Sequence, residues 1–351
     1  MLHLKADIRE IAHRLGDTAQ AFSGKTILLS GGRGFVGSYF VDVFLYLGEH
    51  VLESPCRVVL LDNLITANEA GAVGEASPRC IFVKHDVIEP YACEEPIDFV
   101  VHTAGIASPY YYRKYPLETL EVATLGTKNM LNLAREHGAR FLFFSSSEIY
   151  GDPDSKHVPT PESYRGNVSC VGPRACYDES KRLGETLTRI YHKQFGVLTS
   201  TVRPFNVYGP GMRETDYRVL PNFASRIIDE RPLRVYGSGD QTRTYCYITD
   251  AMVGFIRVLV DGIPGEAYNI GNSKPEISVL NLIEQIENVL GRKFEVIQTE
   301  YPDSYPPDEP IRRCPDITRA RLELKYEPKV NLHEGLRRFF SWAETVYTGE
   351  Q

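Results

Sequence analysis

Tyr177 and Lys181 are the two residues of this chain whose types and spacing point most directly to chemistry. They lie four positions apart in the segment YDESK, and this spacing puts both side chains on one face of a helix. A tyrosine hydroxyl acts as a base near neutral pH only if its pKa falls, and a neighbouring ammonium group stabilises the phenolate. The pair therefore predicts proton transfer to or from a substrate hydroxyl, with Tyr177 as the base.

A cluster of serines follows the apolar run ARFLFF. Ser145, Ser146 and Ser147 precede Glu148 at the expected end of a buried strand. A hydroxyl at this position would bind the substrate oxygen whose proton Tyr177 removes. The alternative is that these serines only close the strand.

A glycine turn joins the first expected strand, KTILLS, to a helical stretch. Gly31, Gly34 and Gly37 form a G-x-x-G-x-x-G pattern, in which bare backbone approaches a pyrophosphate at a helix N-terminus. The next strand ends in Asp62 and Asn63. A carboxylate there accepts hydrogen bonds from both ribose hydroxyls and repels a 2′-phosphate, which favours NAD over NADP.

Two later strand ends complete the predicted cofactor site. Asp86 either meets the adenine amino group or caps its own strand, and residues 103–105 supply small side chains where the fourth strand passes the cofactor. The residues predicted to bind NAD, apart from the Tyr177 and Lys181 pair, are Gly31, Gly34, Phe35, Val36, Gly37, Asp62, Asn63, Asp86, Val87, Thr103, Ala104 and Gly105.

Strands and helices alternate along the first two thirds of the chain. The runs RVVLLDN, CIFVKHD and DFVVHTA indicate buried strands, and long helices are expected over 117–138 and 176–196. This alternation predicts right-handed crossovers and an α/β fold with a doubly wound parallel sheet of the Rossmann type. After about Tyr208 the shorter, Pro- and Gly-rich elements predict a smaller mixed α/β lobe that binds the substrate.

Length and composition limit the alternatives. The 351 residues carry a formal charge of −7, and at roughly 150 residues per domain they predict about two folding units. No run approaches ~20 apolar residues, so we expect no membrane span. The acidic balance argues against a nucleic-acid partner. The predicted units are a helical extension over 1–23, a cofactor domain over 24–207 with part of 245–275, and a substrate lobe over 208–244 and 276–345.

The cysteines and the first residues predict the compartment and the role of the extension. Seven cysteines form no C-x-x-C pair, which argues against a metal site and favours reduced thiols in a cytoplasmic protein. In MLHLKADIREIAHRL the apolar positions Leu4, Ile8, Ile11 and Leu15 form one stripe of an amphipathic helix. We expect this helix to pack on the body of the protein or on a partner subunit.

Taken together, these motifs resemble the extended short-chain dehydrogenase/reductase family of NAD-dependent nucleotide-sugar epimerases, dehydratases and decarboxylases. The resemblance runs from about Lys25 to about Trp342. It is closest to UDP-glucuronate decarboxylases in the segments SSSEIYGDP, PRACYDESKR, RPFNVYGP, LRVYGSGDQTRTYCYITD and RRCPDI. The pair Ser147 and Glu148 is decarboxylase-like, whereas dehydratases of the family place an Asp before the Glu.

This resemblance implies a set of roles. Ser146 corresponds to the family's active-site Thr/Ser, and Arg313 to an arginine that decarboxylases place beside the sugar. In the implied reaction we expect Glu148 to manage a proton or a bound water near C5. The residues implied to bind a nucleotide-diphosphate sugar, with a UDP-sugar favoured, are Tyr112, Asn206, Arg218, Val235, Tyr236, Arg243 and Arg313. The implied reaction oxidises C4, releases the C6 carboxylate as CO2 and reduces C4 again, with tightly bound NAD regenerated in each cycle.

Several positions depart from the decarboxylase pattern. Glu121 and Ala123 stand where Lys and Asn are usual, Ala67 and Asn68 replace a Gly-Arg pair, and Gly105-Ile106 replaces Ser-Pro. Either the substrate differs or these positions have drifted. The alternatives are a nucleotide-sugar epimerase or isomerase using the same C4-keto chemistry, and a non-catalytic nucleotide-binding relative.

Family members commonly dimerise through the two long helices, which implies a homodimer here. The apolar positions of these helices that would serve an interface or intrachain packing are Leu120, Leu125, Met130, Leu183, Leu187 and Ile190.

Overall fold

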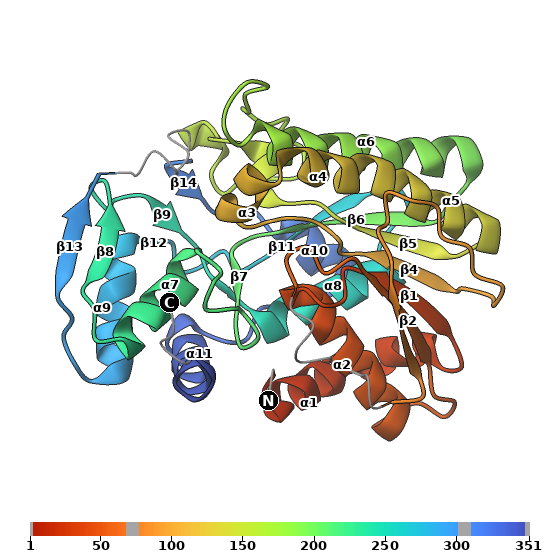
Figure 1. Cartoon of the computed structure of the whole chain (residues 1–351), viewed down its shortest axis with the longest axis horizontal. Coiled ribbons are helices and arrows are strands. Elements are labelled where there is room, and N and C mark those ends of the chain that lie inside the picture. Colours follow the sequence, from red (N-terminus) through yellow and green to blue (C-terminus); the bar gives the residue numbers. More distant parts are fainter. Residues whose placement is uncertain (1–2, 68–76, 301–309, 348–351) are drawn as a thin grey trace.

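A seven-stranded parallel sheet forms the centre of the protein, with strand order β11-β6-β5-β4-β1-β2-β3 (Figure 1). The computed structural model describes residues 3–67, 77–300 and 310–347. The strands are β1 (Thr26–Ser30), β2 (Arg57–Asp62), β3 (Cys80–Lys84), β4 (Phe99–His102), β5 (Arg140–Phe144), β6 (Thr199–Pro204) and β11 (Ala267–Ile270). The predicted doubly wound sheet is confirmed. Its order reverses between β1 and β4, where ligands bind in such sheets.

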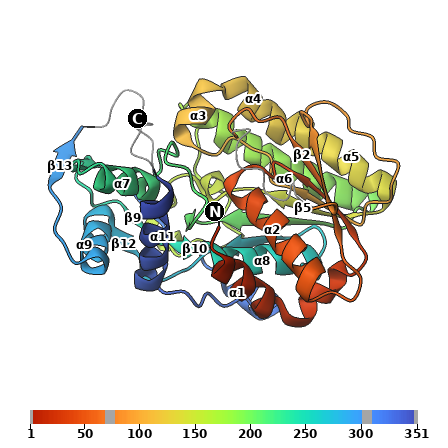
Figure 2. The same ribbon diagram turned by 60° about the horizontal axis from the view of Figure 1, so that its bottom comes forward.

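Helices cover both faces of this sheet. Figures 1 and 2 show α2 (Phe35–His50) and α8 (Ile248–Asp261) on one face and α4 (Pro116–Glu121), α5 (Thr127–His137) and α6 (Ala175–Phe195) on the other. Successive residues of a strand point to opposite faces. Accordingly, Ile27 and Leu29 of β1 join the core with α2 and α8, whereas Leu28 joins the core with α5.

The helix expected over 117–138 is interrupted. Helix α4 is followed by a π-helical turn, η2 (Val122–Gly126), before α5 begins, and Gly138 ends α5 in the left-handed conformation. The Thr124 and Thr127 hydroxyls donate to carbonyls four residues earlier, Leu120 and Ala123, at 2.8 Å. Such back-bonding competes with the helical ladder. No helix in the described part of the chain is both long and apolar enough to cross a membrane.

The second lobe lies beside the carboxyl edge of the sheet (Figure 1). It consists of α7 (Val219–Ile228), α9 (Val279–Leu290), α11 (Leu332–Val346), the parallel pair β8 (Leu233–Tyr236) and β13 (Val296–Thr299), and the small sheet β12 (Ile277–Ser278), β9 (Thr242–Arg243), β14 (Arg312–Arg313). Between its two passages through this lobe the chain returns to the main sheet through α8 and β11. This return supports the domain division given above, which we keep as a proposal.

Short elements connect these parts. They are η1 (Gly16–Phe22), α3 (Pro109–Lys114), η3 (Ser147–Tyr150), η4 (Ser155–His157), the pair β7 (Val207–Tyr208) with β10 (Cys246–Tyr247), and α10 (Thr318–Leu324).

The predicted N-terminal helix is α1 (Lys5–Leu15), and it packs on α2 and α8. Ile8, Ile11 and Leu15 are buried in the same core as β1, so the predicted apolar stripe faces the body of the protein. The extension is therefore part of the folded unit.

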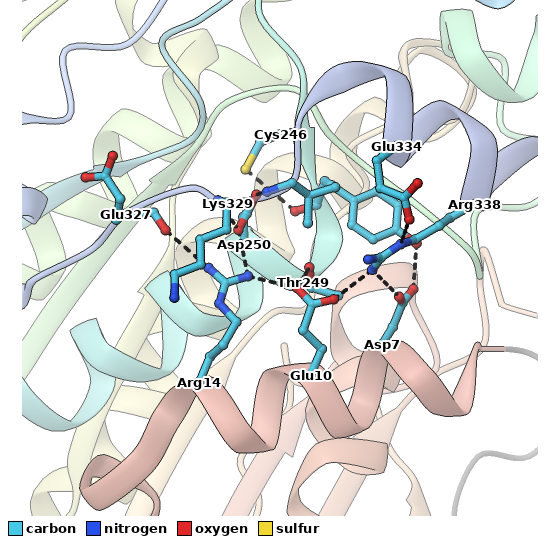
Figure 3. Close-up of polar contacts among 12 residues, drawn as sticks. Asp7, Glu10, Arg14, Cys246, Thr249, Asp250, Glu327, Lys329, Glu334 and Arg338 are labelled. Carbon is cyan, nitrogen blue, oxygen red and sulfur yellow. Dashed lines mark hydrogen bonds and ion pairs between the residues drawn. The ribbon is translucent and has the colours of Figure 1, made fainter. Parts of the chain in front are cut away.

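The opposite edge of α1 enters a network of charges that also includes α8 and α11 (Figure 3). Arg338 of α11 donates to Asp7 at 3.1 Å and to Glu10 at 2.7 Å, and Arg14 pairs with the buried Asp250 of α8 at 2.7 Å. Tyr247 donates its hydroxyl to Asp7 at 2.6 Å. Helix α1 thus joins the cofactor domain to the second lobe through ion pairs.

Asp7 is fully buried, and burial raises its pKa from the ordinary 3.8 to about 6 despite Tyr247 and Arg338. The folded state therefore holds this proton more tightly than the unfolded chain does. Asp7 contributes most to stability below pH 4, and this contribution is lost as the pH rises through 6, by about 3 kcal/mol in all.

We predict that the difference in free energy of unfolding between wild type and Asp7→Asn falls as the pH rises from 4 to 6. Urea unfolding at several pH values measures it. Glu10→Gln is the matched control, because the pKa of Glu10 is lowered by Arg338, although burial opposes this. Its difference from wild type should rise with pH. A flat or rising difference for Asp7→Asn would contradict the prediction.

Candidate active site

One cavity of about 1070 Å³ lies between the carboxyl ends of the central strands and the second lobe. The cavity is lined by all of the residues that the sequence predicts to bind the cofactor, to bind the substrate or to transfer a proton. The catalytic candidates are Tyr177, Lys181, Ser146, Ser147, Glu148 and Arg313; the substrate candidates are Tyr112, Asn206, Arg218, Val235, Tyr236 and Arg243; and the cofactor candidates run from Gly31 to Gly105.

The glycine turn brings backbone segments into closer contact than any side chain permits. A Cβ on Gly37 would lie 2.3 Å from the carbonyl oxygen of Gly31, and one on Gly31, whose φ is +74°, would lie 2.5 Å from Cα of Ala104. Gly34 is the N-cap residue of α2, so the amides of its first turn have no partner within the helix, and Phe35 and Val36 of this turn line the cavity. This cradle fits the pyrophosphate of a dinucleotide.

Asp62 stands at the end of β2 and lines the same cavity as this cradle. Its carboxylate accepts the backbone N–H groups of Arg33 and Leu64, each at 2.9 Å. Asn63 donates to Asp86 at 2.8 Å, and Asp86 also accepts the N–H of Ile88 at 3.2 Å. Asp86 therefore caps its strand while lining the cavity, so both expected roles are compatible with its position.

The proton-transfer residues meet at the ends of β5 and α6. The hydroxyl of Tyr177 is hydrogen-bonded to Ser146, and Nζ of Lys181 lies 5.8 Å from the Tyr177 ring centre. Lys181 donates to the carbonyl of Phe144 at 2.8 Å, and Ser147 begins η3 immediately after Ser146. The four-residue spacing in α6 does place both side chains at one site.

The pKa values at this site differ from the simple expectation for a base beside an ammonium group. Burial raises the pKa of Tyr177 to about 12, although the Ser146 hydrogen bond opposes this. Burial also lowers the pKa of Lys181 to about 8. The reason is that both groups are desolvated and the lysine bonds a backbone carbonyl rather than the phenol. In this state Tyr177 is a neutral phenol at neutral pH.

Glu148 lies between guanidinium groups from both lobes. Arg313 of β14 donates to it with two nitrogens at 2.6 Å each, and Arg174, which precedes α6, donates to the same carboxylate. Burial favours the protonated acid, but the charges of Arg174 and Arg313 outweigh it and hold the pKa of Glu148 below its ordinary value. Glu148 is thus an ionised carboxylate in a site rich in arginine.

The substrate-side residues are held by their own contacts. Tyr112 stacks on Tyr177 with ring centres 5.4 Å apart and planes inclined by 14°. Asn206 donates to the carbonyl of Thr244 at 2.8 Å, and Arg243 donates to that of Pro310 at 2.7 Å. Arg218 pairs with Asp216 at the start of α7.

The departures from the decarboxylase pattern fall into two groups. Glu121 and Ala67 line the cavity, so these changes face the site, whereas Ala123 is buried within the chain and does not line it. Ile106 packs with Tyr112 and Tyr177. Asn68 lies outside the described residues.

Sequence comparison assigns the family. Residues 27–271 match the model of the NAD dependent epimerase/dehydratase family. The chain belongs to this family. It is 40% identical over 316 residues, 90% of its length, to UDP-glucuronic acid decarboxylase 1 of Arabidopsis thaliana, of which it covers 69%. It is 39% identical, over 90% of its length, to UDP-glucuronic acid decarboxylase 1 of Xenopus tropicalis, of which it covers 71%. The resemblance stated from the sequence is confirmed.

Solved structures of related enzymes have the same fold. The chain resembles the dTDP-glucose 4,6-dehydratase DesIV from Streptomyces venezuelae, with NAD and TYD bound, with a TM-score of 0.80 and 27% identity over 92% of this chain and 97% of that one. It also resembles UDP-glucuronic acid 4-epimerase from Bacillus cereus, in complex with UDP-glucuronic acid and NAD, with a TM-score of 0.76 and 26% identity over 92% of this chain and all of that one. NAD is the cofactor of this family, as predicted.

Sequence reasoning missed three arginines of the site. Arg174 contacts Glu148, while Arg213 reaches from the second lobe to the carbonyl of Thr66, beside Arg33 of the glycine turn. The segment PRACYDESKR carried a signal for Arg174, because it is the most specific of the quoted segments. Nothing in the local sequence indicates the partners of Arg213.

We predict that Gly37→Ala abolishes NAD retention, because the new methyl group would push the glycine turn apart. Its expected cost in stability is about 1–3 kcal/mol. The measurement is the NAD released from denatured protein after gel filtration. Gly48→Ala in the same helix is the matched control, since its Cβ would meet only ordinary contacts at 3.5 Å. Full NAD occupancy in Gly37→Ala would contradict the prediction.

Proposed function

We propose that this protein is a UDP-glucuronate decarboxylase that forms UDP-xylose through a 4-keto intermediate. The observation that carries the proposal is the position of the Glu148–Arg313 pair. Two cationic side chains and a proton-handling carboxylate lie in the same cavity as the Tyr177 hydroxyl and the dinucleotide cradle. A uronate needs such a cation for its C6 carboxylate. The similarity to decarboxylases over 90% of the chain supports the same assignment.

Tyr177 and Ser146 handle the C4 hydroxyl in the proposed reaction. Ser146 hydrogen-bonds the C4 oxygen and the phenol, and Tyr177 takes the hydroxyl proton as C4 is oxidised. NAD, when bound, accepts the hydride from C4 and later returns it. Because burial opposes the phenolate, the groups that stabilise it are essential. Ser146 and Arg218 lower the pKa of Tyr177, and Lys181 presents its amine on the same helical face.

Loss of CO2 follows from the C4 ketone. The ketone makes the C6 carboxylate part of a β-keto acid, so the C5–C6 bond breaks and its electron pair moves to the C4 oxygen as an enolate. Tyr177 and Ser146 donate hydrogen bonds to that oxygen. The Glu148 carboxylate orients a water as the proton source for C5, and Arg313 binds the C6 carboxylate until CO2 leaves. Return of the hydride to C4 completes the pentose and regenerates the cofactor, which therefore stays bound.

A second outcome is a 4-epimerase acting on the same substrate. Glu121 faces the cavity where decarboxylases usually carry lysine, and a structural neighbour at 26% identity is a UDP-glucuronic acid 4-epimerase. Hydride return to the opposite face of C4 without loss of CO2 would give UDP-galacturonate. The products separate the two reactions.

We predict that the purified protein releases CO2 from UDP-glucuronate and forms UDP-xylose, measured by trapping labelled CO2 and by chromatography of the nucleotides. UDP-galacturonate without CO2 would favour the epimerase. No turnover of UDP-glucuronate by NAD-loaded protein would contradict both.

Tyr177→Phe should lower kcat by about 100- to 10,000-fold, because the general base is removed, while NAD stays bound. Tyr191→Phe is the matched control, because it also removes a tyrosine hydroxyl from α6. That hydroxyl contacts Asn132 outside the cavity, so kcat should stay near the wild-type value. Wild-type turnover in Tyr177→Phe would refute Tyr177 as the base.

We further propose that two copies pair through α4 and α6. Of the apolar positions named for this interface, Met130 is fully buried and Leu187 packs against the core, so these two serve the interior. The exposed ones are Leu120, Leu125, Leu183 and Ile190, joined by Leu117. Exposed apolar side chains on two helices that pack against each other support a subunit interface. The proposed compartment is the cytoplasm, and the seven unpaired cysteines support a reducing environment.

The double variant Leu120→Glu/Leu183→Glu should therefore be monomeric in sedimentation experiments, whereas wild type should be dimeric. Leu322→Glu is the control, because Leu322 is exposed on α10, away from both helices. A monomeric wild type would contradict the proposed pairing.

A further inference from the structure

Arg174 is bound to both the base helix and the Glu148 carboxylate. It is the residue before α6, and its carbonyl accepts the N–H groups of Tyr177 and Asp178 at 2.9 and 3.0 Å. Its side chain is only 6% exposed and points to Glu148. One residue thus fixes the first turn of the helix that carries Tyr177 and contacts the carboxylate across the site.

The charges around Arg174 form an alternating row. Asp178 lies 3.7 Å from Nε of Arg174, Arg174 binds Glu148, and Glu148 binds Arg313. Asp178, Arg174 and Glu148 belong to the cofactor domain, whereas Arg313 comes from the second lobe. All four side chains are at most 15% exposed, so each depends on its neighbours for neutralisation.

A bound uronate substrate would add a further carboxylate to this row of charges and change how they are neutralised. Arg313 gives both of its terminal nitrogens to Glu148 in this structure. To bind the C6 carboxylate as well, which is its role in the proposed function, Arg313 must share its N–H groups and its charge between Glu148 and the substrate. A buried carboxylate that loses its cation is strongly destabilised and takes up a proton. Arg174 then stays bonded to Glu148, beside the charge of Arg243 from the second lobe, which also favours the carboxylate.

We propose that Arg174 is a positioning residue that holds the Glu148 carboxylate in place while Arg313 binds the carboxylate of the substrate. This inference rests on the proposed function and extends it to a residue that does not touch the reacting atoms. Arg174 keeps Glu148 ionised through the release of CO2, so that Glu148 orients the proton source for C5. Asp178 shares the charge of Arg174 and thereby limits its pull on Glu148.

The pH dependence of kcat tests this role. Arg174→Gln removes the cation, so the acid limb of the kcat profile should move up by about one pH unit, and kcat at neutral pH should fall about 100-fold. Arg174→Lys should return the acid limb toward that of wild type. Asp178→Asn leaves all of the Arg174 charge to Glu148 and should shift the limb in the opposite direction. Arg189→Gln, which breaks an exposed ion pair on the same helix, is the control.

Thermal melting and NAD occupancy of each variant identify those that fold. If Arg174→Gln does not fold, Asp178→Asn still tests the proposal through the opposite shift. Unshifted acid limbs in the folded variants, with kcat scaled equally at every pH, would overturn the inference while leaving the proposed function intact. Absence of UDP-glucuronate turnover by the wild type would instead overturn the proposed function, and this inference with it.

Discussion

A carboxylate that is buried must be neutralised, and in this protein that requirement ties the two lobes together at the reacting centre. Glu148 follows the serine-rich end of β5, and one of the two arginines bonded to it, Arg313, belongs to a strand of the second lobe. The pair forms only when β14 lies against the cofactor domain. This contact between the lobes thus assembles the group that would receive a uronate carboxylate.

The cofactor side of the cavity obeys a steric constraint. Backbone atoms of the glycine turn and of the β4 exit approach so closely that a single methyl group on Gly31 or Gly37 would collide with them. Electrostatic interactions add to this steric constraint. The free amides of α2 favour an anion, and Asp62, held by two backbone N–H groups, lines the same cavity. The shape and the charge of this part of the cavity are therefore both compatible with the dinucleotide cofactor of the family.

The N-terminal helix adds another connection between the lobes. Its apolar stripe is buried against α2 and α8, while Asp7, Glu10 and Arg14 bind groups from α8 and α11. Burial raises the pKa of Asp7 to about 6, which shows that desolvation of the carboxylate outweighs its attraction to Arg338. The contribution of this network to stability therefore depends on pH, whereas that of the apolar stripe does not.

Local sequence patterns were sufficient to predict much of the fold and of the site. The alternation of apolar runs and helices predicted the parallel sheet, because strand and helix periods are properties of short segments. The glycine spacing and the YDESK spacing predicted which side chains share a face, and the structure places all of these residues around one cavity. The stripe of α1 predicted burial but left open whether the covering surface was the chain itself or a partner.

Long-range contacts decided the rest. The sequence could not show that burial raises the pKa of Tyr177 or that Lys181 bonds the Phe144 carbonyl, because desolvation depends on everything packed around a group. It could not pair Arg174 and Arg313 with one carboxylate, since residues 26 and 165 positions away from Glu148 meet only in the folded chain. The sequence by itself determined the elements, the chemical groups and their local faces. Only the tertiary structure decided their charge states and partners, because both depend on distance and solvent access between segments far apart in the chain.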